Sequence, residues 1–181
     1  MNRLLVLGLL SLAACNPFFA EVDAPSVCVA VANQPFPGSP IGGSMPPVDV
    51  TANLQDGGLF LSDKDTTRSL RVTSAKIAST DGTDLHGINQ FKIVVVAPSG
   101  SGLRDITIVD ETQTLPSPSY EIPLTTDPGV ELEKYLFAAP PTPLSATQIT
   151  ARVTASGTPP PTPWTGTVEA CFHVTVSRNF P

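Results

Sequence analysis

Apolar and polar residues alternate with a period of two along most of this chain, which is the pattern of β-strands that bury one face. The alternation is clearest over residues 27–31, 48–54, 149–155 and 168–176. In each segment the bulky apolar side chains share one parity, so one face of the strand is expected to be buried and the other solvated. A further strand is expected around Ile106 and Ile108.

Two segments depart from strict alternation in ways that place them in a sheet. Over residues 69–77 the apolar parity changes, which predicts a β-bulge or a crossing between sheets near Thr73 or Ser74. Residues 91–97 are apolar on both parities apart from Lys92, which predicts a strand in the middle of a sheet with both sides covered.

Proline and glycine mark the edges and ends of the predicted strands. Pro123 lies inside the strand predicted over 120–124 and cannot donate to a ladder, so this strand is expected at an edge. Residues 34–47 contain five prolines and three glycines and are predicted to be irregular. Asp56-Gly57-Gly58 predicts a hairpin turn into 59–61, and a short helix is expected over 130–137, after Asp127-Pro128.

These patterns together predict an all-β fold. Seven to nine short strands separated by turns are typical of a β-sandwich, either immunoglobulin-like or of jelly-roll type, with at most one short helix. The 20 prolines agree with this prediction because proline ends helices. We find no internal repeat and expect one domain.

The first fifteen residues have the organisation of an export signal, with a basic start, an apolar core and small residues before a cysteine. A basic start with Arg3 leads into an apolar run of eleven residues over 4–14, which is shorter than the roughly 20 residues that cross a bilayer. The run ends in Leu12-Ala13-Ala14-Cys15, which resembles the lipobox of bacterial lipoproteins. The resemblance implies cleavage before Cys15 and acylation of its thiol. The alternative is an ordinary secretory signal, cut near Ala14 or Ala20, with an unmodified cysteine.

The resemblance divides the chain into a signal peptide over 1–14, an acylated cysteine with a tether over 15–25, and a β-sandwich domain over 26–181. In enterobacterial lipoproteins an aspartate after the cysteine favours the inner membrane, and here Asn16 follows it. The resemblance therefore implies an exported protein, lipid-anchored at the outer membrane or the cell surface. The sandwich domain itself resembles β-sandwich lipoproteins of no assigned activity, over Tyr135-Leu136 and residues 149–156 and 164–171.

The net negative charge of the chain limits the classes of partner that it is expected to bind. The chain has 10 Lys and Arg against 16 Asp and Glu, and removal of the leader with Arg3 would leave a formal charge of −7. An acidic surface without a basic run argues against nucleic acid as a partner. The membrane, through the lipid anchor, and an envelope protein or a glycan are the expected partners.

The cysteines that remain once Cys15 is acylated predict a disulfide. Cys28 and Cys171 both lie on the parity opposite the bulky apolar row of their strands. A bridge between them would join the first strand to the last on the outer face of a sheet, in an oxidising compartment where disulfides persist. Two free thiols are the alternative.

The residues that could carry chemistry are few. The two histidines, His86 and His173, lie in no recognisable catalytic motif, and a solvated or locally hydrogen-bonded imidazole is the simpler interpretation. No cofactor is expected. Calcium is the alternative, because carboxylates gather in two loops, although turns favour the same residue types. These candidate ligands are Asp63, Asp65, Asp81 and Asp84.

Trp164 follows a proline-rich stretch and is the one candidate for a binding contact. Such a ring either contacts a sugar or a protein, or folds back to seal one end of the sandwich. With no nucleophile, acid and base set in view, we expect a non-enzymatic binding, adhesion or structural module. The alternatives are a subunit of an envelope complex, joined through an edge strand such as 120–124, and a hydrolase whose site is built from loops around His86.

Overall fold

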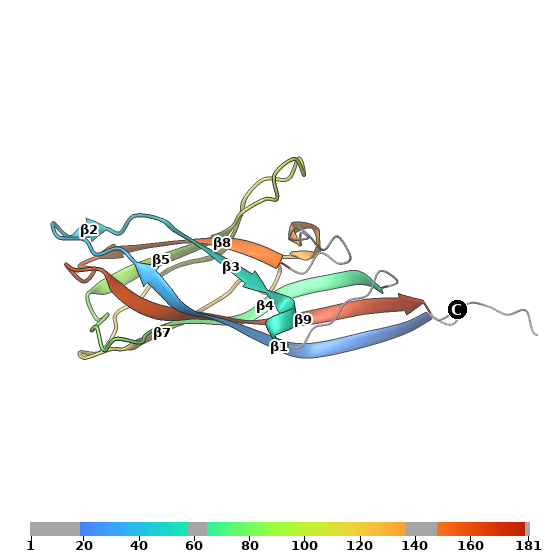
Figure 1. Ribbon diagram of the computed structural model, residues 1–181, viewed down its shortest axis with the longest axis horizontal. Coiled ribbons are helices and arrows are strands. Elements are labelled where there is room, and N and C mark those ends of the chain that lie inside the picture. The colour runs from blue at the N-terminus through green and yellow to red at the C-terminus, as the bar shows by residue number, and fades with distance from the viewer. Residues whose placement is uncertain (1–18, 58–64, 137–147, 180–181) are drawn as a thin grey trace, which may run out of the picture.

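The computed structural model describes residues 19–57, 65–136 and 148–179, and in these ranges the chain is almost entirely strand (Figure 1). The strands are β1 (Phe19–Phe36), β2 (Gly43–Ser44), β3 (Val48–Asn53), β4 (Asp65–Ser79), β5 (Ile88–Val95), β6 (Ile106–Thr112), β7 (Glu121–Leu124), β8 (Gln148–Gly157) and β9 (Trp164–Asn179). Two short 3₁₀ helices, η1 (Leu54–Gly57) and η2 (Glu133–Tyr135), are the helices of the described chain. No helix in these ranges has the length and apolarity needed to span a bilayer.

The strands form two antiparallel sheets packed face to face, so the predicted β-sandwich is confirmed. One sheet has the order β1-β9-β4-β7, and the other has β3 and β2 beside β8, followed by β5 and β6. The pairing is nested: β1 pairs with β9, β3 with β8, β4 with β7 and β5 with β6. This nesting is the jelly-roll arrangement and distinguishes the fold from the immunoglobulin-like alternative.

The core forms where the alternation of the sequence predicted it. In β1, Val27 and Val29 are buried between the sheets, whereas Cys28 is on the outer face. In β9, Phe172, Val174 and Val176 are buried in the same way. One continuous apolar cluster therefore joins the two sheets.

The first and last strands are neighbours, as predicted, and a disulfide joins them. β1 and β9 pair from Phe19 opposite Asn179 to Phe36 opposite Trp164, with Cys28 directly opposite Cys171. The Cys28–Cys171 bond is present. The ladder has register shifts between Ala24 and Val27 and between Val31 and Gln34.

Two predicted boundaries of β1 are wrong. Residues 19–25, assigned to the tether, form the first part of the strand, because β9 continues to Asn179 and offers them an antiparallel partner. Residues 34–36 also belong to β1, and Gly43–Ser44 form β2, although 34–47 was predicted to be irregular. Pro35 is compatible with a strand here because β1 is an edge strand, whose outward side needs no N–H.

Three predictions about individual strands can be compared with the sheets. A register shift between Val72 and Ser74 confirms the bulge in β4, and β7, with Pro123, lies at an edge as predicted. β5 is in the middle of its sheet, between β8 and β6. The prediction that both its sides are covered is wrong, because Lys92 is exposed and Val94 is only half-buried.

The remaining local predictions concern turns. The helix predicted over 130–137 is reduced to the single 3₁₀ turn of η2, because the Leu132 N–H donates to the Leu70 carbonyl of β4 and Leu136 has an extended backbone that ends the turn. The turn at Asp56 and Gly57 forms part of η1. The expected hairpin partner over 59–61 lies outside the described residues.

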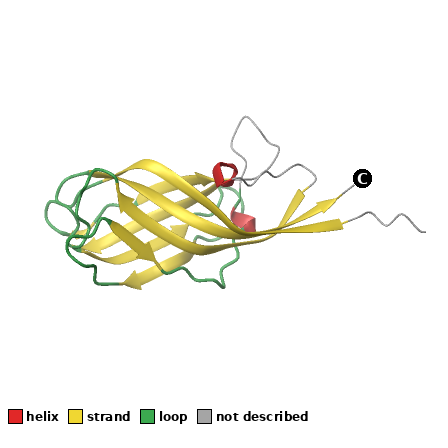
Figure 2. Ribbon diagram, turned by 90° about the horizontal axis from the view of Figure 1, so that it is seen from below, coloured by secondary structure: helices red, strands yellow, loops and turns green. Residues whose placement is uncertain are grey.

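The molecule has two distinct ends (Figures 1 and 2). At one end β1, β4 and β9 extend beyond the other sheet, and Phe19 and Asn179, which are paired, lie at its tip. We call this the proximal tip. At the opposite end lie the connections over 37–47, 80–87, 113–120 and 158–163, which we call the distal loops.

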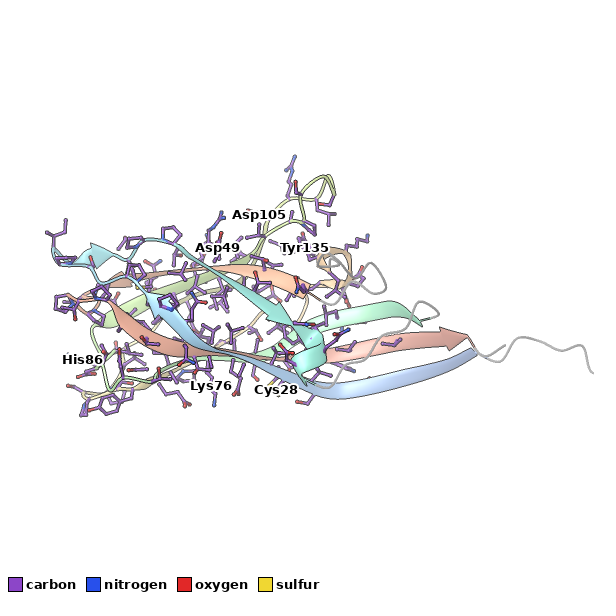
Figure 3. The ribbon with its side chains drawn as sticks, viewed as in Figure 1. Cys28, Asp49, Lys76, His86, Asp105 and Tyr135 are labelled. Carbon is purple, nitrogen blue, oxygen red and sulfur yellow. A yellow bond between two sulfur atoms is a disulfide. The ribbon has the colours of Figure 1, made fainter. Side chains whose placement is uncertain are left out.

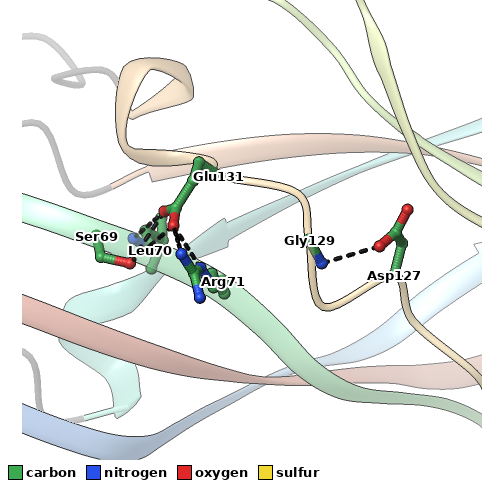
Figure 4. Close-up of polar contacts among 6 residues, drawn as sticks. All are labelled: Ser69, Leu70, Arg71, Asp127, Gly129 and Glu131. Atoms are coloured by element: carbon green, nitrogen blue, oxygen red, sulfur yellow. Dashed lines mark hydrogen bonds and ion pairs between the residues drawn. The ribbon is translucent and has the colours of Figure 1, made fainter.

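The open edge of β4 is covered by the segment that precedes η2 (Figure 4). The carboxylate of Glu131 accepts a hydrogen bond from the Ser69 hydroxyl at 2.9 Å and one from the Leu70 N–H at 3.4 Å, and it forms an ion pair with Arg71. The Leu132 N–H donates to the Leu70 carbonyl at 2.8 Å. Burial raises the pKa of Glu131, but the hydrogen bonds from Arg71 and Ser69 outweigh it, so the pKa is lowered.

We expect Glu131→Ala to lower the free energy of unfolding by about 1–3 kcal/mol, because it leaves the part-buried Leu70 N–H without its acceptor. Urea unfolding measures the loss, and hydrogen exchange should speed up at the Leu70 amide. Glu133→Ala is the matched control, since the Oε2 atom of Glu133 is buried without a hydrogen-bond partner in the described chain. A greater loss in the Glu133 variant than in the Glu131 variant would contradict this account of the edge.

Candidate functional site

The distal loops differ in composition from the rest of the chain. Together they contain ten of the chain's 20 prolines, but only two charged residues, Asp81 and Asp84. Charged residues make up 14% of the whole chain. Depletion of charged residues is a feature of the core of protein interfaces. The distal loops are therefore the candidate binding surface.

The first and last of the distal loops are joined by backbone contacts. The Ser39 N–H donates to the Pro160 carbonyl at 2.9 Å, and the Ser39 hydroxyl donates to the Gly42 carbonyl at 2.9 Å. A Cβ atom at Gly38 would lie 2.4 Å from the backbone of Thr162, so only glycine allows this approach. Loops 37–47 and 158–163 therefore pack as one unit.

Asp81 joins loop 80–87 to the start of β9. Its carboxylate accepts hydrogen bonds from the Thr165 N–H at 2.8 Å, the Thr83 N–H at 3.1 Å and the Ser79 hydroxyl at 3.0 Å. Hydrogen bonds from Thr83 and from the Thr165 backbone lower the pKa of Asp81 from 3.8 to about 2. The residue works as an ionised clamp between two segments.

Asp84 joins the same loop to loop 113–120. Its Oδ1 accepts hydrogen bonds from the Ser119 N–H at 2.8 Å and the His86 N–H at 3.0 Å, and its Oδ2 lies 2.8 Å from the His86 Nδ1. The backbone hydrogen bonds, first from Ser119 and then from His86, lower the pKa of Asp84. Between these residues Leu85 is fully buried and its N–H donates to the Ser119 carbonyl at 2.7 Å.

A further contact completes the connection among the four loops. The Thr158 N–H donates to the Gly87 carbonyl at 2.7 Å, and a Cβ atom at Gly87 would lie 2.2 Å from the Thr158 carbonyl oxygen. Each distal loop is thus hydrogen-bonded to at least one other. Such a surface is ordered before it meets a partner, which reduces the entropy lost on binding.

The distal loops present apolar groups to solvent. Ile41 is 99% exposed at the turn before β2, and Tyr120 is 50% exposed just before β7. Pro40, Pro116 and Pro161 are exposed as well. With both carboxylates of this end engaged in hydrogen bonds, the surface suits a partner that is itself mostly uncharged.

Trp164, predicted either to make a binding contact or to seal one end of the sandwich, is a core residue. It is 3% exposed at the first position of β9, and its ring stacks on Phe36 with the ring centroids 4.2 Å apart. The ring therefore seals the distal end of the sandwich from inside, which is the second of the two predicted roles, and the indole is not exposed. Its Nε1–H is buried without an acceptor in the described chain.

The structure describes only two of the four candidate calcium ligands in full. Asp63 and the side chain of Asp65 lie outside the described residues, while Asp81 and Asp84 use their oxygens for the hydrogen bonds above. Within the described side chains, no three His, Cys, Asp or Glu residues are placed to hold a metal ion.

The two histidines lie far apart in the fold. His86 is at the distal end, paired with Asp84 (Figure 3). His173 is on the outer face of the β1-β9-β4-β7 sheet, with its Nε2 2.5 Å from Asp23 Oδ1. The Ser119 hydroxyl, near His86, donates to the Glu121 carbonyl, so it is directed away from the imidazole. The Asp84–His86 pair joins its loop to loop 113–120, and within the described chain no hydroxyl is hydrogen-bonded to the imidazole.

The interior between the sheets contains a small apolar cavity of about 50 Å³. Its lining includes Val29, Val72, Val153 and Phe172 and is almost free of polar surface. A cavity of this size and character stays dry and can hold no more than a very small apolar group. It offers no site for a sugar or a charged ligand.

Sequence reasoning missed the distal loops as a site. The signal was present as four charge-poor segments, three of them rich in proline, but they lie far apart along the chain. Only the nested strand order brings them to one end. Ile41 and Tyr120 were therefore not recognised as parts of a common surface.

We expect Asp81→Asn to lower the melting temperature at pH 5, because an amide cannot accept all three hydrogen bonds. The folded pKa of about 2 lies below the ordinary 3.8, so the stabilising contribution is present above pH 3.8 and is lost as the pH falls toward 2. The difference in melting temperature between wild type and variant should shrink over that interval. Asp56→Asn, at an exposed carboxylate in η1, is the control. A difference that is constant from pH 5 to pH 2 would refute the clamp.

We expect Trp164→Ala to cost about 3–5 kcal/mol of unfolding free energy, because it opens a large cavity beneath the distal loops. Trp164→Phe should cost about 1 kcal/mol or less, since it keeps an aromatic ring on Phe36 and removes an indole N–H that lacks an acceptor. Circular dichroism during urea unfolding measures both. Equal losses would contradict the account that the stacked ring stabilises this end of the sandwich.

No protein-family model matches the chain, and no curated protein sequence matches it. Among solved structures, it is similar to a chain of the infectious bursal disease virus Gt strain, with 13% sequence identity and a TM-score of 0.34, covering 99% of this chain and 43% of the viral one. A chain of the Gx strain gives 13% identity and a TM-score of 0.29, covering 91% and 32%. The chain spans less than half the length of these viral chains.

Proposed function

We propose that this protein is an exported, non-enzymatic binding or adhesion module, held at the outer membrane or cell surface by acyl groups on Cys15, which contacts an envelope protein or a glycan through its distal loops. The observation that carries the proposal is the separation of the two ends. The strand that follows Cys15 begins at the proximal tip, and the charge-poor, interlinked loops lie at the opposite end.

The proximal tip supports the anchoring half of the proposal. Phe19 is four residues after Cys15, and four residues span at most about 14 Å. An acylated Cys15 would therefore keep the tip close to the bilayer. Each buried CH₂ of an acyl chain contributes about 0.8 kcal/mol, so several chains hold such a domain without a membrane-spanning helix.

The distal loops support the binding half. β9 runs for 16 residues, from Trp164 at the distal end to Asn179 at the proximal tip, which corresponds to about 50 Å of strand. An anchored molecule that stands on its tip would present the loops at that distance from the lipid. The exposed groups there, Ile41 and Tyr120 among the prolines, are those of a preorganised contact surface.

The alternative roles have less support. Strand addition at β7 would use an edge of four residues in which Pro123 lacks an N–H and its carbonyl already accepts a hydrogen bond from Gln113 at 3.2 Å. A loop-built hydrolase would need a nucleophile beside His86, and the neighbouring Ser119 hydroxyl donates elsewhere. Neither role has a specific observation in its favour.

The proposal is tested in two steps on protein made in a diderm bacterial host. The intact mass should correspond to a chain that begins at Cys15 and carries acyl groups, and Cys15→Ser should release the protein from membranes. A photo-crosslinking residue at position 41 or 120 should then capture a partner in intact cells. Exposed positions Ser74 and Ser99, away from the distal loops, are the matched controls. An unacylated mass would refute the anchor, and equal capture at all four positions would refute a binding site at the distal loops.

A further inference from the structure

The strand nearest the proposed anchor is also an edge strand. β1 begins at Phe19 and pairs on one side only, with β9. If Cys15 is held in a membrane while the distal loops hold a partner, any tension between the two enters the fold through the start of β1. Both the anchor and the partner belong to the proposed function, on which this inference rests.

The hydrogen-bonded ladder between β1 and β9 is not continuous. Tension from the proximal tip toward the distal loops runs along the strands, so it strains the hydrogen bonds between β1 and β9 in shear. Register shifts between Ala24 and Val27 and between Val31 and Gln34 break the ladder into three short runs. A short run of hydrogen bonds yields more readily than a continuous one, and loss of β1 would open one edge of the core.

The disulfide bypasses this weakness. Cys28 lies nine residues into β1 and is bonded to Cys171 in β9. β9 is an inner strand, paired with β4 on its other side from Asp65 to Ser79. Tension that reaches Cys28 therefore passes through a covalent bond into the middle of the sheet, and from there along β9 to the distal loops.

We propose that the Cys28–Cys171 disulfide makes this protein a force-transmitting connector, in which tension between the lipid anchor and loop 158–163 is carried by the bond and the first part of β9 and bypasses residues 29–157. Residues 29–170 lie between the two cysteines, so most of the domain is enclosed by the bond. The route from residue 15 to loop 158–163 runs from 15 to 28, across the bond to 171, and back along β9. The chain between Cys28 and loop 158–163 carries none of this tension.

The extension under load distinguishes the two routes between positions 15 and 162. The route through the bond follows the chain from 15 to 28 and then from 171 back to 162, whereas the other route follows the whole chain from 15 to 162. At about 3.6 Å per residue, the first route spans about 80 Å and the second about 530 Å. The folded distance is about 50 Å, so the two routes are easily told apart.

The experiment stretches single molecules of the chain from residue 15 onward in optical tweezers. DNA handles are attached to azide-bearing residues that replace Cys15 and the exposed Thr162. We expect the oxidised protein to lengthen to no more than about 80 Å, at forces where the same molecule, reduced in place, extends to about 530 Å. Reduction after folding avoids reliance on Cys28→Ser with Cys171→Ser, which serves as a second test if that variant folds.

A second handle position gives the matched control. Between positions 15 and 41 the shortest route is the chain itself in both redox states, so the full extension should not depend on the disulfide. The forces at which the oxidised and reduced molecules extend are compared with a reference force. This reference is the force that pulls the acylated protein out of a supported phospholipid bilayer.

Two outcomes would overturn the proposal. One is an oxidised molecule that extends well beyond the limit of about 80 Å set by the route through the bond. The other is a reduced molecule that stays folded until the anchor leaves the bilayer, because the bond would then bear no tension that the ladder cannot. An unacylated Cys15 would instead refute the proposed function, and is detected separately by mass.

Discussion

The pairing of the first strand with the last constrains everything else in this molecule. β1 and β9 run side by side from the proximal tip to Trp164, and the Cys28–Cys171 bond fixes their register from within. Inside this outermost pair the other strands pair in nested fashion, β3 with β8, β4 with β7 and β5 with β6, which is the jelly-roll arrangement. The nesting in turn sends alternate connections to opposite ends, so four loops that are remote in sequence meet at the distal end.

At the distal end, carboxylates accept hydrogen bonds from backbone N–H groups that carbonyls of a neighbouring strand accept elsewhere in the fold. Proline has no N–H, and ten prolines leave the distal loops with few donors for regular pairing. Asp81 and Asp84 reach across to the N–H groups of Thr165 and Ser119, and Glu131 does the same for Leu70 at the open edge of β4. Asp81 and Asp84 were candidate calcium ligands in the sequence, but their oxygens accept hydrogen bonds that hold segments together. The surface around these two aspartates has no other charged residue within the distal loops.

The sequence predicted the sandwich, the edge position of β7, the bulge in β4 and the disulfide, because each depends on a local signal: a two-residue period, a proline, a change of parity, or a matched parity of two cysteines. It did not predict that residues 19–25 belong to β1, since a strand without a strong apolar period is recognised only from its partner. Nor did it predict that Trp164 would be stacked on Phe36, because that contact joins the end of the first strand to the start of the last. The grouping of the distal loops needed the strand order, which no single segment encodes.

The position of the disulfide along β1 fits a role at the junction between the extension and the sandwich. Cys28 lies where η1 packs against β1 (Figure 3). A Cβ atom at Gly57 would be 2.6 Å from the Cys28 carbonyl oxygen. A bond nearer the proximal tip would fix only the extension, and one nearer Phe36 would leave the core-forming Val27 and Val29 on the part of β1 that can be pulled away. At Cys28 the bond divides β1 at the level where the second sheet begins to cover it. The residues before it can respond to movement of an anchor, while the residues after it stay with the core and the distal loops.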